Sequence, residues 1–167
     1  MLDPHVRDLE QPQLRALVER IAADPEAWTH LVRHEPDART YEQLYRDDHV
    51  GIWLICWLDD HDTGFHDHDL SSGALAVARG AVREERLRVG GVPASRTLRA
   101  GEALTFAAND IHRVSHAGTE PAVTVHAYSP PLWRMGAYEI APDGMLHRHS
   151  VSYAEELRPI DAGTVAA

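Results

Sequence analysis

The stretch Gly64-Phe65-His66-Asp67-His68 decides how this chain is read, because it places a His-x-His pair on a segment with the alternation of a β-strand. Successive side chains of a strand point to opposite faces, so His66 and His68 share one face and Asp67 takes the other. Two imidazoles that converge from one backbone can chelate a first-row metal ion. The stretch therefore predicts a metal site, with a structural or surface histidine pair as the alternative.

A third histidine, His112, lies on another apolar segment, Ile111-His112-Arg113-Val114. The spacing from His68 to His112 leaves room for about four short strands, so both segments can face the interior of one small barrel. Many metal-binding β-barrels supply a carboxylate four or five residues after the pair, but this chain has Ser72 and Gly73 there. We therefore expect three neutral imidazoles as the protein ligands.

Composition and charge exclude several classes of partner. The chain has 167 residues, of which 44% are hydrophobic, as in one ordinary globular domain. The formal net charge of -10 argues against nucleic acid and anionic membranes, which attract basic surfaces. No apolar run approaches the roughly 20 residues that span a bilayer, and we see no signal peptide. With Cys56 as the only cysteine, we expect a cytoplasmic protein, either a monomer or a homodimer.

Residues 1–38 have the pattern of a helical segment packed on the rest of the domain. Apolar residues recur at three- and four-residue spacing and form one stripe: Leu14, Leu17, Val18 and Ile21. Asp24-Pro25-Glu26 then resembles a new helix start, with Asp as the cap and Pro in the first turn. We therefore predict two helices in this segment.

From residue 39 onward the apolar period changes to two, and Gly and Pro turns recur. We predict strands at 39–46, 50–58, 64–66, 73–79, 81–89, 94–99, 103–107, 111–117, 122–129 and 134–141. Many short strands indicate a β-sandwich or a closed barrel, here over 39–158, with a frayed tail at 159–167. The segment 81–89 is polar on both faces, so we expect a solvent-wetted edge or outer strand.

A second cluster of polar residues lies at Thr124-Val125-His126-Ala127-Tyr128. Spacing of two puts Thr124, His126 and Tyr128 on one strand face, where a hydroxyl, an imidazole and a phenol can hydrogen-bond in series. Such a series would orient the Tyr128 hydroxyl and fix the tautomer of His126. A core strand with satisfied polar groups is the alternative.

These features resemble the cupin superfamily and, within it, the cysteine dioxygenase (thiol dioxygenase) family. The resemblance covers about residues 39 to 140 and rests on the two histidine segments and on strands with these sequences: Leu54-Ile55-Cys56-Trp57 and Ala127-Tyr128-Ser129-Pro130-Pro131-Leu132. That family also lacks the carboxylate ligand. The resemblance implies an all-β fold with N-terminal helices, specifically a cupin, that is, a small jelly-roll β-barrel. It also implies an Fe(II) ion held by His66, His68 and His112, and a small thiol oxidised by O2 to its sulfinate, with Tyr128 at the reacting groups.

Two departures from the family pattern concern the substrate. Animal members link the tyrosine to a cysteine at the position of Gly73, so no thioether can form here. The family binds the substrate carboxylate with the Arg of a Tyr-x-Arg segment, whereas this chain has Arg39-Thr40-Tyr41, with the two types exchanged. Arg39, Tyr41 and Arg46 are therefore our candidate substrate residues. The thiol could be cysteine-like or a bulkier thiol-imidazole amino acid such as ergothioneine.

Two other functions remain open at this point. A different cupin metalloenzyme, such as a Zn or Mn isomerase or a carbon-cleaving dioxygenase, usually needs a fourth protein ligand or a carboxylate. A small-molecule-binding cupin without catalysis would have little need of both the metal ligands and the Tyr128 series. His116, on the strand of His112, is either a neighbour that supports the metal ligands or a structural histidine.

Overall fold

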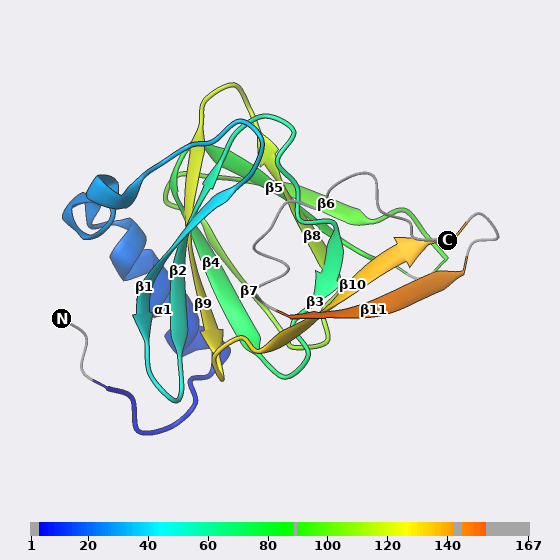
Figure 1. Ribbon diagram of the computed structural model, residues 1–167, viewed down its shortest axis with the longest axis horizontal. Coiled ribbons are helices and arrows are strands. Elements are labelled where there is room, and N and C mark those ends of the chain that lie inside the picture. The colour runs from blue at the N-terminus through cyan, green and yellow to red at the C-terminus, as the bar shows by residue number, and fades with distance from the viewer. Residues whose placement is uncertain (1–3, 89, 142–144, 153–167) are drawn as a thin grey trace.

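Two antiparallel sheets face each other in the structure, a computed structural model that describes residues 4–88, 90–141 and 145–152 (Figure 1). The five-stranded sheet has the order β1-β2-β9-β4-β7, and the six-stranded sheet has the order β11-β10-β3-β8-β5-β6. The first contains β1 (Thr40–Arg46), β2 (Gly51–Trp57), β9 (Ala122–Ser129), β4 (Ser72–Arg79) and β7 (Ala103–Phe106). The second contains β11 (Leu146–Ser152), β10 (Arg134–Ile140), β3 (Phe65–Asp67), β8 (His112–Ala117), β5 (Ala81–Arg86) and β6 (Ala94–Arg99). The predicted all-β architecture is confirmed.

Strand β9 lies at the centre of the five-stranded sheet and is buried along its whole length. Val123, Val125 and Ala127 point to the outer face, where they join the core beneath the N-terminal helix. The alternating residues point between the two sheets, so the polar side chains of Thr124 and His126 are sealed inside the barrel. A strand that is covered on both faces provides a rigid support for them.

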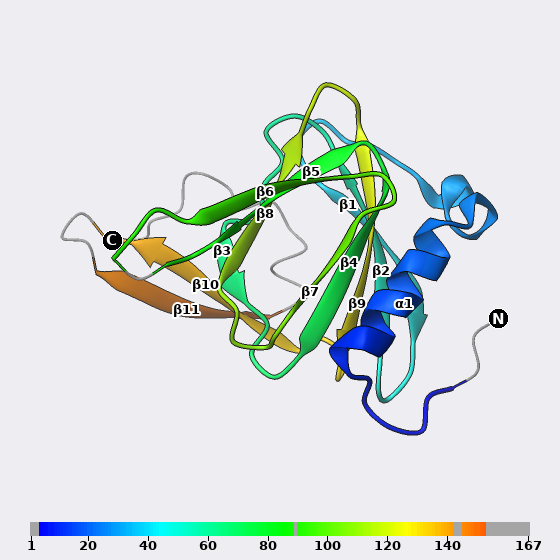
Figure 2. The same cartoon turned by 180° about the vertical axis from the view of Figure 1, so that it is seen from behind.

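The helix α1 (Gln11–Ala22) lies across the outer face of the five-stranded sheet and contacts β4, β7 and β9 (Figure 2). It begins with a capping box between Glu10 and Gln13, and its side chains Leu14, Leu17 and Val18 are buried against the sheet. Each such burial contributes about 1.5–3 kcal/mol, so this one helix covers the sheet firmly. The predicted apolar stripe thus packs as expected.

The second predicted helix does not form. Residues after Asp24 make two short 3-10 turns instead, Pro25–Ala27 and Thr29–Leu31. Trp28 lies between them with a non-helical backbone (φ -141°), its side chain is buried, and its indole N–H donates to the carbonyl of Ala22. Packing of this one large side chain outweighs a weak local helix signal.

The prediction of a solvent-wetted strand at 81–89 is wrong. Strand β5 ends at Arg86 and lies between β8 and β6, so it is an inner strand of its sheet. Val82 and Glu84 are buried, with 0% and 2% of their surface exposed. A carboxylate is buried only when it is paired, and the partners of Glu84 are Arg86, Arg96 and His112. Two of these partners lie on other strands, so the local sequence pattern could not predict the burial.

Strand β11 was not predicted, because as an edge strand it has mostly exposed side chains and no alternation of apolar residues. Its Arg148 reaches across β10 and binds both carboxylate oxygens of Asp67, at 2.8 and 2.9 Å. Tyr138 also donates to Asp67, and so does the backbone N–H of Gly136. Burial would raise the pKa of Asp67, but these hydrogen bonds outweigh it and lower the pKa to about 2. Asp67 therefore ties β3 to β10 and β11.

No helix in the described ranges is long and apolar enough to cross a membrane. The predicted tail at 159–167 lies outside the described residues, so the domain limits stay predictions.

Replacing Arg148 with Met should destabilise the fold by about 1–3 kcal/mol, because it leaves the buried Asp67 carboxylate without its bidentate partner. This loss is smaller than that expected for a fully buried ion pair, because the Arg148 side chain is 38% exposed and solvent screens part of its charge. Urea unfolding measures the difference. Arg134→Met is the matched control, since Arg134 is 55% exposed and pairs with the neighbouring Asp69. Equal losses in the two variants would contradict the role given to Arg148.

Candidate metal centre and its cavity

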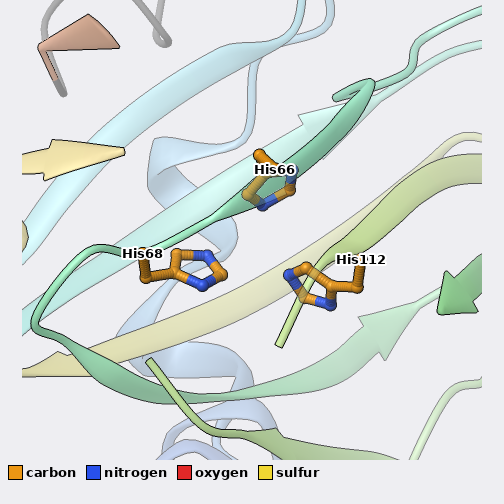
Figure 3. A group of neighbouring side chains, drawn as sticks. All are labelled: His66, His68 and His112. Carbon is orange, nitrogen blue, oxygen red and sulfur yellow. The ribbon is translucent and has the colours of Figure 1, made fainter. Parts of the chain in front are cut away.

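Three imidazole rings meet between the two sheets (Figure 3). His66 lies on β3, His68 directly follows that strand, and His112 begins β8, where it is the cross-strand partner of His66. One ring nitrogen from each histidine lies within 4.8 Å of the others, and all three residues are buried. The structure therefore brings together the three residues that the sequence predicts as ligands, and Asp67 points away as expected.

Hydrogen bonds orient two of the rings. The Nδ1 atom of His66 lies 3.0 Å from the carbonyl oxygen of Gly64, and the Nδ1 atom of His112 lies 3.2 Å from a carboxylate oxygen of Glu84. Because both partners only accept hydrogen bonds, both Nδ1 atoms donate, which leaves Nε2 of each ring as the nitrogen available to a metal ion. A bare imidazole nitrogen is the donor that metal ions bind.

His68 differs from the other two. Both of its ring nitrogens are buried, and neither has a hydrogen-bond partner in the described part of the chain. An unsatisfied buried polar group costs about 1–3 kcal/mol, so such a group needs an explanation. A metal ion bound among the three rings would supply the missing partner for one nitrogen. The residues present therefore fit a metal ion that takes nitrogen ligands.

The charge state of the rings also suits a metal. Burial, together with the neighbouring imidazoles, holds the pKa of His66 and His68 well below the ordinary value of 6.5. Both rings are therefore neutral at physiological pH, which is the form that coordinates a metal. The group of converging donors contains three imidazoles and no carboxylate.

Phe106 supports the ring of His68 in the absence of a hydrogen bond. The two rings stack with centroids 4.4 Å apart and an angle of 23° between their planes. Phe106 can lie there only because its cross-strand partner is Gly73: a Cβ atom at residue 73 would lie 2.2 Å from the Phe106 ring. Gly73 and Phe106 thus form one complementary pair. The sequence gives no signal of this pair, because it depends on the register of β4 and β7.

The predicted hydrogen-bond series on β9 is present in the structure. The hydroxyl of Thr124 lies 2.8 Å from Nε2 of His126, and Nδ1 of His126 lies 3.2 Å from the hydroxyl of Tyr128. Trp57, which the sequence did not single out, extends the series, since its indole N–H donates to Thr124 at 2.8 Å. Burial, with smaller contributions from His112 and Arg39, lowers the pKa of His126 to about 3. The imidazole of His126 is therefore neutral.

The indole gives this series a direction. Trp57 can only donate, so the Thr124 oxygen accepts from it and gives its own proton to a further acceptor. The imidazole of His126 at 2.8 Å is a much better acceptor than the Ile55 carbonyl at 3.5 Å. Nε2 of His126 is then the acceptor and Nδ1 the donor. Tyr128 accepts from His126 and acts as a donor toward its next partner.

A cavity with a volume of about 40 Å³ opens beside the three histidine rings. Its wall is mostly apolar and includes Ile55, Leu132 and Met135, and its polar lining includes His66, His126 and Tyr128. Such a space holds about three or four waters, so it suits a small ligand. The metal centre and the β9 series therefore face one common space.

Arg39 and Tyr41 line this cavity, and Arg46 does not. The guanidinium of Arg39 lies over the rings of Tyr41 and Trp57, at 5.7 and 5.4 Å from their centroids. Arg46 is the exposed last residue of β1, whereas Arg39 directly precedes that strand, which puts them roughly 23 Å apart along the chain at about 3.3 Å per residue. The structure therefore does not support Arg46 as a substrate residue.

His116 does not support the metal ligands. Its Nδ1 atom lies 3.0 Å from Asp59, and its Nε2 atom lies 2.8 Å from the carbonyl oxygen of Glu120. It lines a different surface pocket, with Pro36 and Leu58. His116 is thus a structural histidine.

Comparison with known proteins identifies one family. The profile of the family described as cysteine dioxygenase type I matches residues 6–141. Cysteine dioxygenase type 1 of zebrafish (Danio rerio) is 27% identical over 134 residues, which is 72% of this chain and 65% of that protein. The human protein of the same name is 27% identical over 141 residues, which is 76% of this chain and 68% of that protein. The chain thus spans about two-thirds of the length of these curated relatives, and slightly less for zebrafish.

Solved structures agree on the fold. A protein of Thermus thermophilus superposes with a TM-score of 0.55 at 18% identity, covering 62% of this chain and 93% of that one. A cupin superfamily protein of Desulfitobacterium hafniense gives a TM-score of 0.52 at 14% identity, covering 62% and 87%. At these identities the likeness shows the fold alone, and it confirms the predicted cupin barrel.

Gly73→Ala should destabilise the protein by about 1–3 kcal/mol, because its methyl group collides with Phe106 and displaces the ring that supports His68. Urea unfolding measures the loss, and adding Phe106→Leu should restore part of it. Gly91→Ala is the control, since the nearest atom to its new Cβ is 3.9 Å away. A Gly73→Ala variant as stable as the parent would contradict the packing described.

Acidification should destabilise the metal-free protein in a defined window. The buried imidazoles of His66, His68 and His126 stay neutral in the fold, whereas they titrate near 6.5 in the unfolded chain. The unfolded state therefore binds more protons below about pH 6.5, and the free energy of unfolding falls by up to about 1.4 kcal/mol per pH unit for each ring. Urea unfolding at about pH 7.5, 6.5 and 5.5 measures this slope. A slope that is unchanged in His126→Gln would contradict the contribution of that ring.

Proposed function

Because the chain belongs to the cysteine dioxygenase type I family, we propose that it is an Fe(II)-dependent thiol dioxygenase that converts a small thiol into its sulfinate with O2. The observation that carries the proposal is the buried group of three imidazoles with no carboxylate among its donors. His66, His68 and His112 would hold the ion. The partners are a small thiol and dioxygen, in a cytoplasmic protein.

Charge explains why a thiol suits this site. Three neutral ligands leave the two positive charges of an Fe(II) ion uncompensated, and an anionic thiolate offsets one of them. The bound ion would supply the point where thiolate sulfur and dioxygen meet. Both atoms of O2 go to sulfur, so RS⁻ and O2 give RSO2⁻ with no other reductant or oxidant.

The chain's own residues would position the reacting groups. Tyr128 receives a hydrogen bond from His126 and is therefore a proton donor toward the cavity that both residues line. Thr124 and Trp57 fix the tautomer of His126 that this direction requires. Apolar residues around the cavity exclude water from the reaction, which strengthens these polar contacts.

Arg39 is the proposed contact for a substrate carboxylate. Arg39 lines the same cavity as His66 and His126. A guanidinium suits a carboxylate through two parallel hydrogen bonds. The proposed substrate is a small cysteine-like thiol, with a bulkier thiol such as ergothioneine as the alternative. Tyr41, under the Arg39 guanidinium, would hold that side chain in place.

Oxygen uptake after anaerobic loading with Fe(II) tests the proposed activity. We expect uptake with a small thiol such as cysteine and a product about 32 mass units heavier than the thiol. The same protein loaded with Zn(II) should show none. The proposal would be contradicted if the iron-loaded protein took up no oxygen with any thiol of a panel that includes cysteine, cysteamine, 3-mercaptopropionate and ergothioneine. That result would favour a binding protein or another metalloenzyme.

Arg39→Gln should lower kcat/KM for a carboxylated thiol by roughly 10- to 100-fold, the equivalent of one lost charged hydrogen bond of about 1.5–3 kcal/mol. Cysteamine lacks the carboxylate, so its kcat/KM should change little. Arg46→Gln is the matched control, because Arg46 is exposed and lies outside the cavity. Equal losses for cysteine and cysteamine would contradict a carboxylate contact by Arg39.

A further inference from the structure

Glu84 is a buried carboxylate that has no role in the reaction proposed above. It lies on the inner face of β5, and 2% of its surface is exposed. Isolated carboxylates are almost never buried, because removing the charge from water costs several kcal/mol. Some interaction inside the barrel therefore accounts for its position.

Three donors converge on the Glu84 carboxylate. One oxygen lies 2.9 Å from Nε of Arg86 and 3.2 Å from Nδ1 of His112, and the other lies 2.8 Å from Nε of Arg96. Arg86 is itself fixed, since it also donates to the carbonyl of Thr105 and to Asp110. The carboxylate is thus held in one place and in turn holds the His112 ring.

The two arginines do not explain why Glu84 is buried. Their side chains are 36% and 51% exposed, so Arg86 and Arg96 reach water without a buried partner. The His112 side chain is 2% exposed, as is that of Glu84, so this contact is the one least screened by solvent. The contact with His112 is the one that requires the carboxylate to lie inside.

We propose that Glu84 is a positioning residue for the metal centre, acting through His112. Its carboxylate holds the proton on Nδ1, aims Nε2 at the space between the three rings, and raises the basicity of that nitrogen. The direct ligands include no carboxylate, and Glu84 would thus place a negative charge one imidazole away from the metal. This inference rests on the proposed metal site.

Metal affinity of Glu84→Gln tests the inference. Gln keeps the size and removes the charge, so we expect Co(II) and Fe(II) to bind roughly 10- to 100-fold more weakly, measured anaerobically by competition with a chelator. The visible spectrum of the bound Co(II) should change as well. Glu85→Gln is the matched control, because Glu85 is the next residue on the strand and pairs with Arg113 instead. We expect Glu85→Gln to bind both ions as the parent does.

Each result separates this inference from the proposed function. Parent-like affinity and an unchanged Co(II) spectrum in a folded Glu84→Gln protein would overturn the role of Glu84 and leave the metal site standing. A parent protein that binds neither ion would overturn the proposed function, and this inference with it. If Glu84→Gln fails to fold, Glu84→Asp keeps the charge and withdraws the carboxylate by one methylene. Its affinity should fall in the same direction, and parent-like affinity would contradict the inference.

Discussion

Burying three imidazoles against one another is the constraint on which the rest of this structure depends. A metal ion needs the bare nitrogen of a neutral ring, and burial together with the neighbouring imidazoles keeps the rings of His66 and His68 in that form. Each ring must also be fixed so that one bare nitrogen faces the centre. The three rings are held in three ways: by a backbone carbonyl, by the Glu84 carboxylate, and by stacking on Phe106.

The strand order makes this arrangement possible. In the six-stranded sheet β3 lies between β10 and β8, so His66 of β3 and His68 directly after it meet His112 of β8. The helix α1 covers the outer face of the other sheet (Figure 2), and β9 of that sheet carries the polar series on its inner face. Asp67, between His66 and His68, binds Arg148 of β11 and so anchors the short strand β3 on the side away from the three rings.

The sequence predicts those parts of the site that follow from spacing along one strand. His66 and His68 share a face because strands have a period of two, and the same rule groups Thr124, His126 and Tyr128. Glu84, Phe106 and Trp57 could not be found in this way, because their partners lie on other strands and depend on register. The sequence around Glu84 even predicted an exposed residue, since a carboxylate among arginines is typical of a solvent-exposed surface. Spacing therefore identifies the groups that act, and three-dimensional pairing identifies the groups that hold them.

The central claim is that His66, His68 and His112 bind iron and leave room for a thiolate beside it. X-ray absorption at the iron edge tests it most directly, on the Fe(II)-loaded protein under anaerobic conditions. The account predicts nitrogen and oxygen neighbours alone in the absence of substrate, and one sulfur neighbour after a small thiol is added. Replacing His112 with Ala should remove the bound iron. A spectrum without sulfur in the presence of saturating thiol would contradict the account.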